Sequence, residues 1–142
     1  MKKILLIGII LFSISNINAQ CNSLKDAISD VKSYADDCFD YAKKAYYAQD
    51  MGNAQYFAKK AKNSSEITMG LVIDAEEYLL SCSCKDSLGI VSNIKQYAEE
   101  AFVFSEKAYL AKELETVHYY AKKAKRSSEK CKEEALLFSC DK

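Results

Sequence analysis

Six cysteines carry the clearest chemical signal in this chain of 142 residues. In a small exported protein, cysteines in this number are typical of disulfide bonds formed in an oxidising compartment. A structural zinc site is the main alternative, but one Cys-x-Cys pair, Cys82 and Cys84, with a single distant histidine lacks the paired ligand spacing of such a site. We therefore expect no metal and no cofactor, and we expect all six cysteines to be bonded. They are Cys21, Cys38, Cys82, Cys84, Cys131 and Cys140.

Other side chains offer little for catalysis. His118 is the only histidine, and no serine or cysteine stands in a recognisable nucleophile motif. Adjacent acids such as Asp36 and Asp37, or Glu99 and Glu100, point about 100° apart on a helix and so do not form a catalytic pair. We expect His118 to be a polar residue on a helix surface, the acids to be solvated, and the protein not to be an enzyme.

The first nineteen residues have the layout of a signal peptide. Lys2 and Lys3 precede an uncharged apolar run over 4–14, and the small Ala19 stands where a signal peptidase would cut. A run of this length is too short to span a membrane, which needs about 20 apolar residues. We expect a mature chain that begins at Gln20 and is secreted or periplasmic. Lipid attachment at the following cysteine is the weaker alternative, because Gln20 is not the small residue expected before a lipidated cysteine.

The mature chain contains one unit twice. Residues 31–66 and 94–129 align without a gap at an offset of 63 residues, with 17 identities in 36 positions. This similarity predicts one helical domain over 20–142, with a first repeat at about 21–83 and a second at about 84–142.

Each repeat has the hydrophobic spacing of two helices. Small and apolar residues recur at alternating steps of three and four, as in a coiled-coil seam. Residues Asp50 to Asn53 interrupt the first repeat, and Leu114 to Thr116 are the expected interruption of the second. We therefore expect an all-α protein, an antiparallel four-helix bundle made of two duplicated, disulfide-stapled hairpins. The expected seam residues are Leu24, Ile28, Val31, Ala35, Cys38, Ala42 and Ala45, then Phe57, Ala61, Ser64, Thr68, Leu71, Ala75, Tyr78 and Cys82, then Val91, Ile94, Ala98, Ala101, Ser105 and Ala108, then Tyr120, Ala124, Ser127, Cys131, Ala135 and Phe138.

The four outer cysteines stand at the open ends of the two expected hairpins. Cys21 and Cys82 lie at similar distances before and after the first turn, and Cys84 and Cys140 stand in a comparable relation to the second. We predict the bonds Cys21–Cys82 and Cys84–Cys140. The crossed pairing, Cys21–Cys84 with Cys82–Cys140, is the main alternative.

The two remaining cysteines each lack a counterpart in the other repeat. Ala101 stands where the first repeat has Cys38, and Thr68 stands where the second has Cys131. Counting residues from the turns places the two cysteines at similar heights on the first and fourth helices, which are neighbours in an up-down-up-down bundle. We predict a third disulfide, Cys38–Cys131, that joins the hairpins.

Basic and aromatic residues gather near the two turns, while the acids lie further towards the cysteines. This separation indicates docking to an anionic surface, such as lipid headgroups or an acidic polysaccharide. The plainer interpretation is that lysine favours exposed helix positions and tyrosine fills the gaps beside an alanine seam. The candidate binding surface consists of Lys59, Lys60, Lys62, Lys122, Lys123, Lys125, Tyr46, Tyr56, Tyr109 and Tyr119.

These patterns predict a small exported, non-catalytic bundle that acts as an interaction or structural module of the bacterial envelope or secretome. Its partner would be another protein or an envelope component. The chain carries 20 basic and 20 acidic residues, and this balance speaks against nucleic acid as the partner. We expect no membrane span, and a homodimer is compatible with the seam. The alternative function is a carrier that binds a small apolar or aromatic ligand between its helices.

Overall fold

The computed structural model describes residues 2–82 and 84–140, with side chains from Ala19 onward except that of Lys85. Of residues 2–18 only the helical backbone is described, so the predicted signal peptide, 1–19, lies outside the part that the structure can test. Within the described part, no helix combines the length and the apolar character that a membrane crossing needs.

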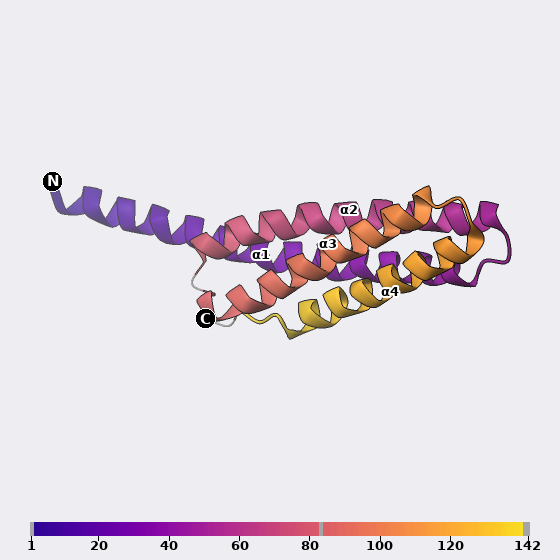
Figure 1. Cartoon of the computed structure of the whole chain (residues 1–142). Coiled ribbons are helices and arrows are strands. Elements are labelled where there is room, and N and C mark those ends of the chain that lie inside the picture. Colours follow the sequence, from indigo (N-terminus) through magenta and orange to yellow (C-terminus); the bar gives the residue numbers. More distant parts are fainter. Residues whose placement is uncertain (1, 83, 141–142) are drawn as a thin grey trace.

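Four helices make up the described chain (Figure 1). They are α1 (Lys2–Tyr47), α2 (Met51–Ser81), α3 (Leu88–Leu110) and α4 (Leu114–Leu137), with a short 3-10 turn, η1 (Lys85–Ser87), before α3. No strand occurs among these residues, so the protein is all-α as predicted.

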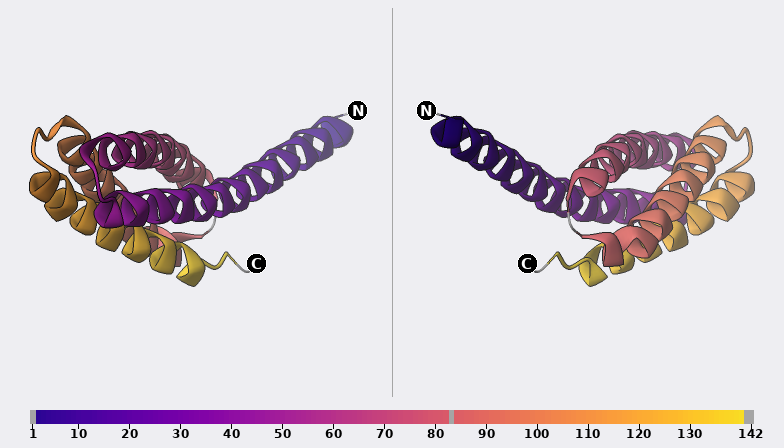
Figure 2. Two further views of the ribbon diagram at one scale, coloured as in Figure 1. Left: turned by 90° about the vertical axis from the view of Figure 1, so that its right-hand side faces the viewer. Right: turned by 90° about the vertical axis from the view of Figure 1, so that its left-hand side faces the viewer.

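The helices pack side by side as a bundle. α1 contacts α2 and α4, and α3 contacts the same two helices. The connections 48–50 and 111–113 lie together at one end of the bundle, which we call the turn end, and the outer cysteines lie at the other, the cysteine end (Figure 1). The first part of α1 extends past the cysteine end, away from the other helices (Figure 2).

The predicted seams of the first and third helices are confirmed. Every expected seam residue of α1 and α3 is buried, and most of these side chains are small. Alanines at the seam let the helix backbones approach closely, and larger residues such as Leu24, Val31 and Ile94 fill the wider part of the core near the cysteine end.

The predicted seams of the second and fourth helices are partly wrong. Phe57, Leu71, Tyr78, Tyr120 and Phe138 are only half-buried and flank the core. Small residues take the axial positions because an aromatic ring there would hold the helices apart. The buried residues are Ala54, Ala58, Ala61, Ser64, Ser65, Thr68, Val72, Ala75 and Leu79 in α2, and Val117, Ala121, Ala124, Ser127, Ser128, Cys131 and Ala135 in α4.

The first turn ends with a capped helix. Asp50 precedes α2, and its carboxylate accepts a hydrogen bond from the backbone N–H of Asn53 at 2.8 Å. This hydrogen bond from the Asn53 backbone is the largest of the causes that lower the pKa of Asp50 below its ordinary value. Residues 51–53, which were expected to lie in the turn, form the start of α2 instead.

The second turn lies slightly earlier than predicted, because α3 ends at Leu110 and α4 already begins at Leu114. Glu113, 63 residues after Asp50, occupies the N-cap position of α4 but makes no side-chain capping bond. The longer glutamate side chain places its carboxylate beyond the backbone N–H groups that aspartate reaches.

Each turn is held by a side chain from the other half of the chain. Gln55 Nε2 donates to the Ala111 carbonyl at 2.9 Å. The equivalent contact joins His118 Nε2 to the Ala48 carbonyl, also at 2.9 Å. His118 is therefore half-buried and binds the first turn, where a residue on the open surface was expected.

Candidate functional site

The outer cysteines form two disulfide bonds at the cysteine end. Cys21 is bonded to Cys82, and Cys84 to Cys140, which are the two pairs favoured from the sequence. The sulfur atoms of Cys21, Cys82 and Cys84 lie within 4.8 Å of one another. Spacing of this kind could hold a metal only if the thiols were free, because the metal ligand is a thiolate and a bonded sulfur is not one.

The predicted bond between Cys38 and Cys131 is not formed, so this prediction is wrong. Both residues are buried free thiols. Ser128 Oγ donates a hydrogen bond to Cys38 Sγ at 2.9 Å, whereas the Cys131 thiol lies 3.7 Å from the Ile94 carbonyl oxygen. Counting residues predicts how far along the bundle each cysteine lies, but it does not predict where each thiol points. In the structure, each thiol contacts a different polar group and not the other thiol.

A polar layer surrounds the two thiols. Ser65, Thr68 and Ser128 line the same narrow space in the core as the two cysteines, and that space is too small for a water molecule. The Ser65 and Thr68 hydroxyl groups donate to backbone carbonyls of their own helix, as Thr68 Oγ1 does to the Ser64 carbonyl at 2.9 Å. Among the described residues, every buried side-chain nitrogen or oxygen has a partner. No ligand fits between the helices here.

Burial suppresses the reactivity of both thiols. It raises the pKa of the Cys38 thiol above its ordinary value and that of Cys131 to about 12. At neutral pH both groups therefore stay protonated. Because nucleophilic attack and metal binding require the thiolate, this pair is chemically quiet in the folded protein.

The candidate lysines at the turn end all lie over aromatic rings. The Nζ atoms of these lysines are 4.6–5.9 Å from a ring centroid. Such cation–π contacts contribute about 0.5–1 kcal/mol each at exposed sites and hold the ammonium in place without neutralising it. The six lysines are Lys59, Lys60, Lys62, Lys122, Lys123 and Lys125.

The structure divides this surface into two equivalent parts. Lys59 of α2 lies over Tyr109 of α3, and Lys122 of α4 lies over Tyr46 of α1, at 5.9 Å in both cases. The α2–α3 seam and the α1–α4 seam are on opposite sides of the bundle, since α1 and α3 each pack between α2 and α4. The candidates therefore form a belt around the bundle, which we call the lysine belt, where one patch was expected.

Tyrosines of the belt differ in exposure. Tyr56 and Tyr119 are 53% and 54% exposed, while Tyr46 and Tyr109 are half-buried between helices. The rings that hold Lys62 and Lys125 are Phe102 and Phe39, at 5.2 Å and 5.4 Å, and sequence reasoning missed them. Spacings of four residues, as from Tyr56 to Lys60, were the readable signal for such contacts. Lysine–aromatic contacts between two helices leave no such regular spacing in the sequence.

Charge is unevenly distributed between the two halves of the bundle. The turn half, 39–66 with 102–129, has 11 basic and 7 acidic residues, while the rest of the chain from Gln20 onward has 7 basic and 13 acidic residues. Among the residues that the structure describes, Lys62 is the only one of those 11 basic residues that forms ion pairs, with Glu66 and Glu106.

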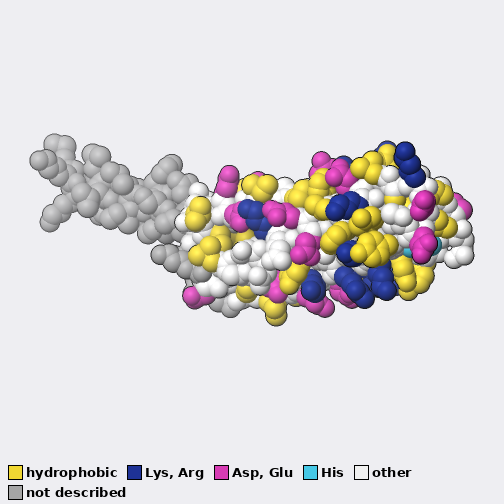
Figure 3. Space-filling view, in the orientation of Figure 1, with side chains coloured by type: hydrophobic (Ala, Val, Ile, Leu, Met, Phe, Trp, Pro, Cys, Tyr) yellow, Lys and Arg dark blue, Asp and Glu magenta, His cyan; other side chains and the backbone are white. Residues whose placement is uncertain are grey.

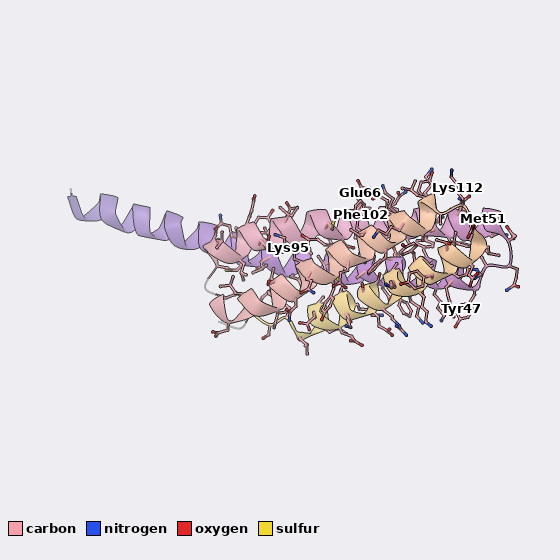
Figure 4. The ribbon with its side chains drawn as sticks, in the orientation of Figure 1. Tyr47, Met51, Glu66, Lys95, Phe102 and Lys112 are labelled. Carbon is pink, nitrogen blue, oxygen red and sulfur yellow. A yellow bond between two sulfur atoms is a disulfide. The ribbon has the colours of Figure 1, made fainter. Side chains whose placement is uncertain are left out.

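Figures 3 and 4 show where these charges lie. Lys and Arg side chains gather mainly over the turn half, interleaved with hydrophobic surface (Figure 3). Tyr47, Met51 and Lys112 mark the turn end in Figure 4, and Lys95 lies towards the cysteine end, where it pairs with Glu76 at 2.7 Å. The turn half thus carries a net positive charge, most of it on cations without a carboxylate partner.

Comparison with known proteins gives no match. No family model, no curated protein and no solved structure is similar to this chain. Its function therefore has to be argued from its own residues.

Proposed function

We propose that this protein is an exported, non-catalytic helical module that binds an anionic component of the bacterial envelope or secretome through its lysine belt. The observation that carries the proposal is the set of ammonium groups held over aromatic rings and left without carboxylate partners. On a solvated helix face, a pair between a lysine and an acid three or four residues away stabilises the helix. Among the described residues of the belt, only Lys62 makes such a pair.

Positive charge and exposed aromatic rings together suit such a partner. Unpaired ammonium groups attract an anion over a distance of about 10 Å at 0.1 M salt. Exposed rings such as Tyr56 and Tyr119 add rigid contact area with a hydroxyl that can donate a hydrogen bond. This combination supports binding to acidic polysaccharide or to an acidic protein surface.

The same proposal includes an antiparallel bundle built from two duplicated hairpins. Lysine–aromatic contacts that recur 63 residues apart, and the reciprocal contacts of Gln55 and His118 with the two turns, support a duplicated origin. Two disulfide bonds support folding in an oxidising compartment, and hence removal of residues 1–19 during export. Duplication would give the molecule two equivalent binding faces.

The test measures binding of the purified oxidised protein to isolated cell envelopes by co-sedimentation. Lys59→Glu with Lys122→Glu should reduce the bound fraction at least about fivefold, because it reverses one unpaired cation on each face. The matched control, Lys95→Glu with Lys130→Glu, makes the same change in charge in the other half and should bind like the wild type. Equal binding by both variants would refute the proposal.

A further inference from the structure

A surface cleft lies at the opposite end of the molecule from the lysine belt. It is about 390 Å³ in volume, between α1 and the end of α4 with the segment that follows it. Lys25, Ile28 and Lys32 line it from α1, while Leu136, Phe138 and Cys140 line it from the other side. This volume is at the lower end of the range of about 300–1,000 Å³ found for small-molecule sites.

The wall formed by residues 138–140 is fixed in place. Cys140 is bonded to Cys84, and Ser87 Oγ donates a hydrogen bond to the Ser139 carbonyl at 2.7 Å. Both contacts tie the end of the described chain to the start of α3. A cleft with a wall held in this way is present before any ligand arrives, which lowers the cost of binding.

Apolar side chains form the floor of this cleft. Ile28 is buried, Phe138 is half-buried, and Leu136 is 56% exposed. An exposed leucine beside an aromatic ring offers apolar area that a ligand can cover, at roughly 25 cal/mol per Å². The floor therefore favours a ligand with an apolar body.

Two cations stand beside the floor. Lys25 and Lys32 are seven residues apart on α1, about two helical turns or 10 Å, on the same side as Ile28. Neither makes an ion pair with any residue that the structure describes, whereas Lys132 nearby is paired with Asp36. The cleft thus joins an apolar floor to two ammonium groups that no described carboxylate pairs with.

We propose that this cleft binds a small amphiphilic acid, with its carboxylate at Lys25 or Lys32 and its chain or ring over Ile28, Leu136 and Phe138. A neutral apolar molecule would make no charge contact with the two lysines, and a cationic amphiphile would be repelled by them. Two ammonium groups about 10 Å apart do not converge on one compact anion such as phosphate. This site is independent of the proposed function of the lysine belt.

The test uses decanoate as the probe, below the concentration at which it forms micelles. Decanoate should raise the melting temperature of the oxidised protein further as its concentration rises above its Kd, because it binds only the folded state. Decanol and decyltrimethylammonium, which share the ten-carbon chain, should raise it far less. An equal rise with all three would mean non-specific apolar binding and would overturn the proposal.

Two variants locate the site. Lys25→Gln with Lys32→Gln should weaken decanoate binding in calorimetry up to about fivefold, since the carboxylate contacts one ammonium group and an exposed charge contact is worth up to about 1 kcal/mol. Ser29→Trp, from an exposed position on the lining, should block the cleft and abolish binding while circular dichroism stays unchanged. The control variant Lys59→Gln with Lys122→Gln, in the lysine belt, should bind decanoate with wild-type affinity. Wild-type affinity in the Lys25→Gln/Lys32→Gln protein would place decanoate elsewhere and refute the inference.

Discussion

Two buried thiols show what burial does to a reactive group. Cys38 and Cys131 lie in a core layer where no water molecule fits, and burial keeps both in the protonated form. In an oxidising compartment, exposed thiols would pair or exchange with other cysteines. Here each thiol instead takes part in a local polar contact, with Ser128 for Cys38 and with the Ile94 carbonyl for Cys131.

These two thiols should resist alkylation in the folded protein. Iodoacetamide at neutral pH should leave the native protein unmodified, and it should label two cysteines, Cys38 and Cys131, once a denaturant is added. Peptide mass spectrometry identifies the labelled residues. As a control, Cys38→Ala with Cys131→Thr, the residues found 63 positions away, should remove the labelling at a cost of about 1 kcal/mol in unfolding free energy. A denatured protein with no free thiol would show that a third disulfide exists after all.

At the scale of the helix, the N-cap residues of the two turns differ by one methylene group. Asp50 caps α2, whereas Glu113 stands at the same position before α4 without capping it. An N-cap acceptor satisfies a backbone N–H that the helix itself cannot, and this contribution depends on how far the side chain reaches.

Exchanging the two acids should change stability in opposite directions. Glu113→Asp should raise the free energy of unfolding by up to about 1 kcal/mol, and Asp50→Glu should lower the melting temperature. The pKa of Asp50 is lowered in the folded state, so its contribution is present above the unfolded pKa of about 3.9 and is lost as the pH falls through the folded value. The difference in melting temperature between wild type and Asp50→Ala should therefore narrow below about pH 4. A pH-independent difference would contradict this account of the cap.

The helices also show how far the sequence predicts the fold. In α1 and α3 the seam was predicted in full, because alanines and branched residues alternate there with charged ones at unambiguous spacing. In α2 the neighbouring residues Phe57 and Ala58 are both apolar, and hydrophobicity alone does not predict which one faces the bundle axis. The distance between the helices determines that the smaller side chain lies there, and this distance cannot be read from the sequence. The lysine belt was predicted by residue type, but its division between two opposite faces required the helix order in space.

Across the whole molecule, the disulfide bonds and the unpaired lysines lie at opposite ends. The disulfides close the cysteine end, while the turn end carries the unpaired cations. Much of the core is alanine, which buries little area per residue, so the bundle depends on its bonds more than a leucine-rich bundle would.

Removing either disulfide should lower the free energy of unfolding substantially. The bonded cysteines are 61 and 56 residues apart, and loops of this length are worth about 4 kcal/mol each in the chain-entropy account. Cys21→Ser with Cys82→Ser, and Cys84→Ser with Cys140→Ser, should each show this loss in denaturant unfolding. A loss below about 1 kcal/mol in both variants would show that the core holds the bundle without them.

The salt dependence of envelope binding tests the central claim, that unpaired cations of the lysine belt hold an anionic partner. The Debye length falls from about 30 Å at 0.01 M salt to about 3 Å at 1 M, so binding of the wild type should fall steeply over this range. Lys59→Glu with Lys122→Glu should bind weakly throughout, with a shallow dependence on salt. Wild-type binding that stays constant up to 1 M salt would contradict the claim.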